Sequence, residues 1–172
     1  MGKAVARVYR PAMAALRVAT NLALVSLVLV VLAAVAVRYF GIFPGSLHWA
    51  TEYSRFGIVW IVMLGSAVAL DQGAHVAIDF TDRLPPALRR AVRRTGFLLG
   101  LFFIAVLAWQ GFRLAGATMR QLSPALRIPV GYAYLALPVG ATIMAVQSVL
   151  FALFPELQAR PESEAALEHP KI

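Results

Sequence analysis

The sequence predicts an all-α integral membrane protein with four transmembrane helices, a short interfacial segment and both termini in the cytoplasm. Of its 172 residues, 60% are hydrophobic and only 14% are charged, whereas soluble domains are nearer half apolar and a quarter charged. Long uncharged runs recur along the chain, each able to cross about 30 Å of hydrocarbon. The net charge of +8 comes from bases beside these runs, so it indicates membrane topology rather than nucleic-acid binding.

The first span is expected at residues 16–38. A basic segment precedes an uncharged run from Val18 to Val37. This pattern also occurs in cleaved signal peptides, and the small residues of Ala34–Ala36 would suit a cleavage site. However, the run is longer than a usual signal peptide core, so an uncleaved helix is favoured.

The second span is expected at residues 47–71, after a turn that contains Pro44. Ser46 is a candidate N-cap, and Asp71 with Gly73 suits a helix end. Residues 74–84 are too short to span a membrane and are predicted to lie along its surface.

The third span is expected at 86–118, because Pro85 and Pro86 suit a helix start. The fourth is expected at 130–154, with a kink at Pro138. Residues 1–155 then form a single four-helix membrane domain, and the polar tail 156–172 is predicted to be disordered. Lys and Arg gather in the N-terminal segment, in residues 71–94 and in the tail, so the positive-inside rule places both termini in the cytoplasm.

Glu52 and Arg55 are an acid and a base one helical turn apart, near the outer end of the second span. A lone charge at membrane depth costs several kcal/mol, and an i,i+3 pair offsets part of that cost. The pair therefore predicts a polar contact with another membrane subunit or with a transported ion, or else an interfacial pair that reaches the headgroups. Trp60 is expected in the core or facing lipid, and Gly65 with Ser66 and Ala69 offers a small helix-packing face.

His75 and Asp79 are spaced to share one face of a helix. Two ligands are too few for a typical zinc site, so a structural or partner contact is favoured over metal. The chain has no cysteine, and its three histidines fall at span ends or in the tail, which argues against haem. No nucleophile–base constellation, phosphate loop or dinucleotide fingerprint is present. We therefore expect no enzyme activity, no metal and no cofactor.

The third span opens with a basic collar: Arg89, Arg90, Arg93 and Arg94. Such residues can bind anionic lipid headgroups, each contributing about 1 kcal/mol near the surface, or can simply orient the helix. Gly96 and Gly100 on the same span have the spacing of a close-approach motif.

The central stretch resembles the small membrane subunit (DctQ-type) of tripartite ATP-independent periplasmic (TRAP) transporters. An acid and an arginine precede an aromatic-apolar run, and a loop of Gly-x-His-apolar-x-apolar-Asp leads into Arg-Leu-Pro. Gln72 and Ala74 depart from the charged residues that are frequent at those positions in relatives. The residues that carry the resemblance are Glu52, Arg55, Trp60, Gly65, Ala67, Gly73, His75, Val76, Ile78, Asp79, Arg83, Leu84 and Pro85.

The resemblance implies an accessory subunit in a bacterial inner membrane. It would brace the scaffold of a large membrane subunit while that subunit's transport domain moves in an elevator motion. Uptake would be coupled to sodium, and a periplasmic substrate-binding protein would deliver an organic acid through transient contact. The candidate contacts with the large subunit are Glu52, Arg55, Trp60, Gly65, His75, Asp79 and Arg83, and the candidate headgroup contacts are the four arginines of the collar.

Two other classes remain open from the residues. A membrane anchor for a redox or enzyme complex would bind haem or quinone and absorb visible light. A self-sufficient channel or small exporter would show flux when reconstituted alone. The substrate within the organic acids is not encoded in this chain.

Overall fold

The computed structural model of the chain describes residues 2–40, 47–72, 85–154 and 157. The described residues form the helices α1 (Gly2–Phe40), α2 (His48–Asp71), α3 (Pro86–Thr118), α4 (Gly131–Tyr134) and α5 (Ala136–Leu153). Four stretches within them are long and apolar enough to cross a membrane, with α4 and α5 together making the fourth. The prediction of an all-α membrane fold with four spanning helices is confirmed.

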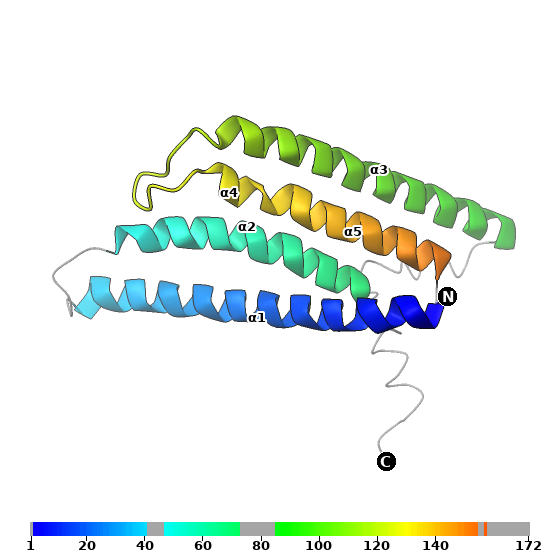
Figure 1. The fold of residues 1–172 in the computed structure, drawn as a ribbon, viewed down its shortest axis with the longest axis horizontal. Helices are drawn as coiled ribbons and strands as arrows, with labels where there is room; N and C mark the ends of the chain where they lie inside the picture. The colour runs from blue at the N-terminus through cyan, green and yellow to red at the C-terminus, as the bar shows by residue number, and fades with distance from the viewer. Residues whose placement is uncertain (1, 41–46, 73–84, 155–156, 158–172) are drawn as a thin grey trace, which may run out of the picture.

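The long helices lie side by side in one layer, in the order α1, α2, α5, α3 (Figure 1). α1 packs against α2, α2 against α5, and α5 against α3, so that α1 and α3 form the two edges. The start of α1 and the start of α3 lie at one end, which we name the N-terminal end. The loop between α3 and α4 lies at the opposite end, which we name the loop end (Figure 1).

α1 begins well before the expected span 16–38. The basic segment that precedes the apolar run continues the same helix from Gly2, with Pro11 inside it. Alanine and arginine are strong helix formers, so this segment extends the spanning helix instead of forming a separate tail.

The start of α2 differs from the expectation in its cap. The expected Ser46 cap is wrong, because the N-cap residue of α2 is Leu47, which makes no side-chain cap bond. The expected interfacial segment 74–84 and all of the predicted tail except Leu157 lie outside the described residues.

The fourth span is interrupted at Leu135, between α4 and α5. Pro138 lies three residues further on and has no N–H to donate to the carbonyl oxygen of Tyr134, one turn earlier. Leu135 still donates to Gly131 at 2.9 Å, and Val139 donates to Leu135 at 3.1 Å. The disturbance expected at Pro138 is therefore seen one turn before the proline.

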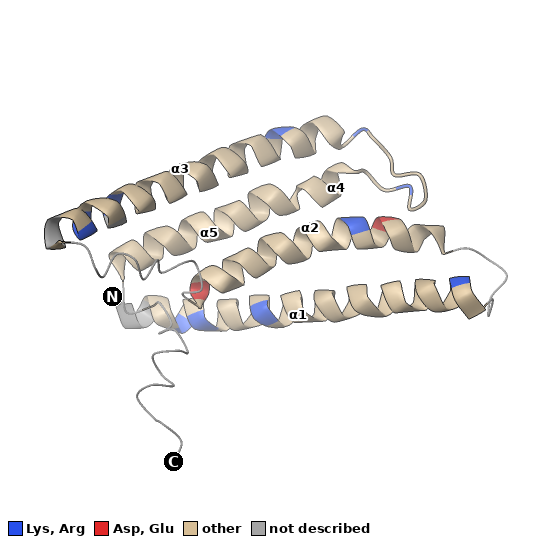
Figure 2. Ribbon diagram, turned by 180° about the vertical axis from the view of Figure 1, so that it is seen from behind, with Lys and Arg blue, Asp and Glu red and all other residues tan. Residues whose placement is uncertain are grey.

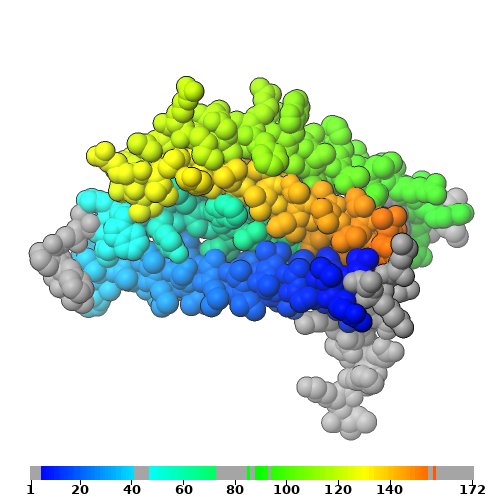
Figure 3. Space-filling view, viewed as in Figure 1, coloured from blue at the N-terminus to red at the C-terminus, as the bar shows by residue number. Residues whose placement is uncertain are grey.

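The best-buried part of the layer lies between its two central helices. Met63 and Ala67 of α2 pack against Ala136 and Met144 of α5. Small side chains let the helices approach closely, and in lipid such packing drives helix association in place of the hydrophobic effect. Because the fold is one layer thick, many of the described apolar side chains outside this core are exposed. All four long helices reach the surface on the face of the layer that Figure 3 shows.

Candidate functional site

The loop end of the layer holds Glu52, the acid of the predicted charged pair. Its two carboxylate oxygens accept hydrogen bonds from the backbone amides of Ala125 and Leu126, at 2.9 and 2.8 Å. Hydrogen bonds to an ionised acceptor are stronger than neutral ones, so this carboxylate fixes the α3–α4 loop against α2. Both oxygens are therefore engaged within the chain, and a role of Glu52 in partner contact stays a prediction.

The loop that Glu52 holds is folded back on itself. Ser123 donates its amide to the carbonyl of Ile128 at 2.9 Å. Arg127 has a φ of 55°, in the left-handed region that costs a non-glycine residue about 1–2 kcal/mol. The two amides bound by Glu52 come just before Arg127, so the carboxylate offsets part of this cost and stabilises the turn.

Arg55 lies three residues after Glu52, and both residues line a small pocket beside the α3–α4 loop. Arg55 forms no ion pair with any of the acids that the structure describes. The sequence predicted that the two charges would act together. The two side chains differ in their contacts: both oxygens of Glu52 are bound to amides of the α3–α4 loop, whereas the side chain of Arg55 is exposed.

Arg55 belongs to a row that we name the outer stripe of α2: Thr51, Arg55, Ile58, Val62 and Gly65. Spacings of four and three residues place them on one face of a helix. Ile58 is 53% exposed and Val62 is 57% exposed. A Cβ on Gly65 would meet nothing within 4 Å. Because α2 is a central helix, this stripe lies on one of the two broad faces of the layer and not on its edge.

Trp60 and two glycines, Gly140 and Gly111, make contacts between the helices of the layer. The indole N–H of Trp60 donates to the carbonyl of Tyr132 at 3.1 Å and so ties α2 to α4. A Cβ on Gly140 would lie 2.8 Å from the Cβ of Met63, and one on Gly111 would lie 2.7 Å from Cδ of Pro138. These two glycines mark where α5 crosses α2 and α3.

The glycines that the sequence singled out for close approach behave differently. A Cβ on Gly96 or on Gly100 would meet nothing within 4 Å among the described residues, as at Gly65. Their small surfaces therefore do not pack α3 or α2 against another helix of this chain. Sequence spacing identifies a small face without showing the direction in which that face points.

Sequence reasoning missed a polar cluster at the N-terminal end, formed by Tyr9, Arg17, Asp71 and Gln147. The hydroxyl of Tyr9 donates to Oδ1 of Asp71 at 2.8 Å. Nη2 of Arg17 lies 3.4 Å from Oδ2 of the same carboxylate. Asp71, interpreted from the sequence as a helix stop, is 7% exposed. The cluster ties α1 to the last residue of α2.

Gln147 joins this polar cluster from α5. Its Nε2 donates to the carbonyl of Ala67 at 3.0 Å and lies 3.4 Å from the hydroxyl of Tyr9. The side chain is 1% exposed. The sequence does show a glutamine inside an otherwise apolar span. Because buried polar groups in membranes need partners, this residue could have indicated a buried polar contact. Its partners could not be read from the sequence, because they are far away along the chain.

The remaining predicted site residues lie toward the N-terminal end or outside the description. Arg89, Arg90 and Arg94 lie on the first turns of α3, at the same end as Arg7, Arg10 and Arg17 of α1 (Figure 2). Arg93 is on the same turns, and its side chain is not among those described. His75, Asp79 and Arg83 fall in residues 73–84, outside the described ranges, so their predicted roles stay predictions. Within the described ranges, no three potential metal ligands come together.

Comparison with known proteins identifies similar chains. The family model "Tripartite ATP-independent periplasmic transporters, DctQ component" matches residues 27–154. The chain is 33% identical over 102 residues to the "C4-dicarboxylate TRAP transporter small permease protein DctQ" of Rhodobacter capsulatus, covering 58% of this chain and 45% of that protein. It is 32% identical over 117 residues to the "Isethionate TRAP transporter permease protein DctMQ" of Oleidesulfovibrio alaskensis, covering 64% of this chain and 18% of that protein. The matches thus span less than half the length of either relative.

Proposed function

Since the chain belongs to the DctQ family of TRAP transporter components, we propose that it braces a large membrane subunit during uptake of an organic acid. Members of this family are components of transporters in the bacterial inner membrane and are not enzymes. The coarse role, a small permease subunit, follows from this membership. The bracing action, the sodium coupling and the substrate class form the proposal.

The observation that supports bracing is the single layer of helices. A compact four-helix bundle buries one face of every helix, but here even the central helices α2 and α5 are open on a face of the layer. A transport domain that moves through the bilayer needs a wide stationary wall to move against. A flat layer of four spanning helices offers a broad contact area and widens whatever it binds.

The outer stripe of α2 is the surface that we assign to the large subunit. Arg55 interrupts an apolar row that ends in Gly65, whose open side allows another helix backbone to approach closely. An arginine that faces lipid costs up to about 2.5–3.5 kcal/mol by insertion scales, less near a helix end. An acid or carbonyl on the large subunit would remove that cost, and the match between base and acceptor would set the register of the two subunits.

The names of the relatives support the remaining parts of the proposal. Isethionate and C4-dicarboxylates are both small organic anions, which fits an organic acid as the cargo. The DctMQ relative carries its matching segment within a much longer permease chain, which fits a tight pairing of small and large subunits. A transient contact with a periplasmic binding protein, and contact of the collar arginines with lipid headgroups, complete the proposed partners.

The proposed orientation places the N-terminal end of the layer in the cytoplasm. In the described helices, Arg7, Arg10 and Arg17 of α1 gather there with the arginines that open α3 (Figure 2), and clustered bases favour the cytoplasmic side. The loop end, with the α3–α4 loop, would then face the periplasm and the delivered substrate.

Charge reversal at Arg55 tests the assignment of the stripe. Arg55→Glu would place a carboxylate where a base is expected to meet an acceptor, and like-charge contacts cost several kcal/mol. We expect recovery of the large subunit with the tagged chain in mild detergent to fall at least about tenfold, since about 1.4 kcal/mol corresponds to a factor of ten. The matched control is Arg120→Glu, the same reversal on the exposed loop. Equal recovery of the large subunit with both variants would count against the stripe.

A further inference from the structure

A groove opens at the loop end, between the last turns of α1 and the first turns of α2. Its volume is about 670 Å³, within the range of sites that bind small molecules and cofactors. Val31, Ala34 and Val35 line it from α1, and Ala50 and Thr51 line it from α2. The alanines on both walls have small side chains, which leave the space between the two helices unfilled.

The groove changes in polarity along its length. Val31, Ala34, Val35 and Arg38 follow one another on a single face of α1, at spacings of three, one and three residues. At about 1.5 Å per residue, roughly 10 Å separates the apolar floor at Val31 from the base at Arg38. His48, the first residue of α2, lines the same end of the groove as Arg38. The groove is therefore apolar toward the middle of the layer and basic at the helix ends.

Aromatic side chains mark the basic end of the groove as the membrane–water boundary. Tyr39 and Phe40 are exposed on the last turn of α1. Trp49 and Tyr53 on α2 form an edge-to-face pair with ring centroids 6.3 Å apart. Tryptophan and tyrosine concentrate at the depth of the lipid headgroups, so the base at Arg38 lies at headgroup level.

The described part of the chain supplies no acid to neutralise Arg38. Arg38, Arg55, Arg113, Arg120 and Arg127 lie toward the loop end (Figure 2). The acid described there is Glu52, and its two oxygens are bound to the amides of the α3–α4 loop. The structure shows no ion pair at Arg38. Any acid that pairs with this base therefore comes from outside the described residues.

We propose that this groove binds one phospholipid with an anionic headgroup. An acyl chain would lie along Val31, Ala34 and Val35, and the headgroup phosphate would meet Arg38. The order of an apolar floor, a headgroup-level boundary and a base follows the order of an acyl chain, glycerol and phosphate in a lipid. This site is distinct from the arginine collar of α3, which lies at the other end of the layer.

Lipid retention by the purified full-length chain tests the proposal. The protein is exchanged into nanodiscs that contain either phosphatidylglycerol or phosphatidylcholine, released into detergent, and its retained lipid is counted by native mass spectrometry. We expect one phosphatidylglycerol molecule to be retained in preference to phosphatidylcholine. Arg38→Gln should lower that retention about fivefold, since one base near the headgroups contributes about 1 kcal/mol. The matched control is Arg120→Gln, which should retain lipid as the unchanged chain does.

A second variant separates an acyl-chain site from a simple anion site. Ala34→Phe fills the apolar floor and should reduce retention of both lipids, whereas millimolar inorganic phosphate should displace neither. Equal retention by the Arg38 and Arg120 variants would overturn the proposal, as would displacement by phosphate alone. If Ala34→Phe disturbs the packing of α1 on α2, the comparison of the two arginine variants still decides the question.

Discussion

The crossing of α2 and α5 gives the sharpest prediction about the fold. A Cβ added to Gly140 would lie 2.8 Å from Cβ of Met63 and 3.0 Å from its carbonyl oxygen. The carbonyl belongs to the backbone of α2 and cannot rotate away as a side chain could. Gly140→Ala therefore requires the two central helices to move apart.

The size of the effect follows from the cost of overpacking a close contact, typically about 1–3 kcal/mol. We expect Gly140→Ala to lower the free energy of unfolding by that amount, despite the better helix propensity of alanine. Gly100→Ala is the matched control, because its added Cβ would meet nothing within 4 Å of this chain. There the propensity gain of up to about 1 kcal/mol should appear unopposed.

Both variants can be measured by denaturant titration of the purified chain in detergent micelles, with helix content followed by circular dichroism. We expect the free energy of unfolding to fall for Gly140→Ala and to rise for Gly100→Ala. If Gly140→Ala were as stable as Gly100→Ala, the close approach of α5 to Met63 would not exist in the protein.

Two further predictions concern the polar contacts. Glu52→Gln leaves one side-chain oxygen to accept hydrogen bonds from two amides. The amides of Ala125 and Leu126 should therefore exchange with deuterium about tenfold faster. Unchanged exchange would show that the carboxylate does not hold the loop. Asp71→Ala should lower the unfolding free energy by about 1–3 kcal/mol, because it removes the buried carboxylate that accepts a hydrogen bond from the partly buried hydroxyl of Tyr9. Arg17→Gln should cost about 0–1 kcal/mol, because that side chain is largely exposed. Equal losses in these two unfolding titrations would argue against the assigned burial of the cluster.

The four spanning helices could be predicted because each contains an uncharged apolar run of sufficient length, and such a run is a local property of the sequence. Their order in the layer could not, since hydropathy does not say which helix packs against which. The interruption at Leu135 illustrates an intermediate case. The missing N–H of Pro138 is local, and it leaves the carbonyl of Tyr134, one turn earlier, without its helical donor. The kink was predicted at the proline itself and not at this earlier turn.

The candidate site was only partly accessible from the sequence for the same reason. Glu52 was identified because an acid is unusual in a membrane helix, but its acceptor bonds go to amides 73 and 74 residues away. Asp71 was interpreted only as a helix stop. Its contact with Tyr9 was missed because Tyr9 lies 62 residues earlier in the chain. Residue type and local spacing identify unusual residues, whereas their partners depend on tertiary packing.

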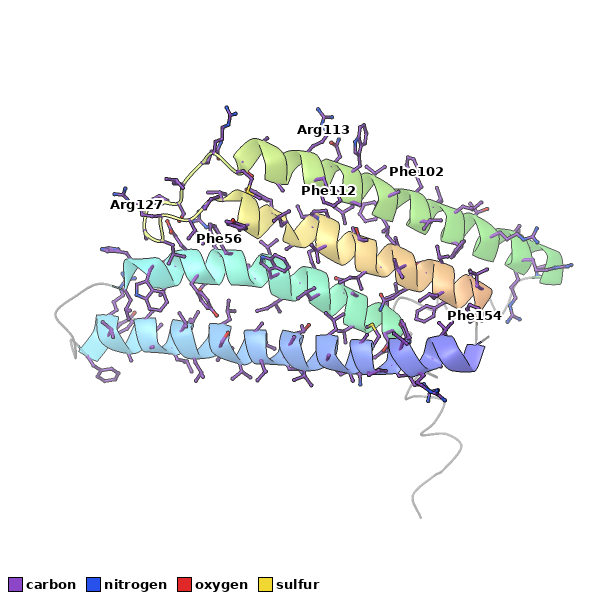
Figure 4. The ribbon with its side chains drawn as sticks, viewed as in Figure 1. Phe56, Phe102, Phe112, Arg113, Arg127 and Phe154 are labelled. Atoms are coloured by element: carbon purple, nitrogen blue, oxygen red, sulfur yellow. The ribbon has the colours of Figure 1, made fainter. Side chains whose placement is uncertain are left out.

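Photo-crosslinking from the outer stripe of α2 in native membranes tests whether this stripe contacts the large subunit. A photoreactive amino acid at Val62, which is 57% exposed, should form an adduct with the large membrane subunit. The neighbouring position Met63 is 8% exposed and faces α5, so the same probe there should give no intermolecular adduct. A third probe at Phe102, which projects from the outer edge of α3 (Figure 4), shows whether the edge makes the contact instead. An adduct of the large subunit from Val62 is the predicted result; adducts from Phe102 alone, or from neither exposed position, would contradict the account.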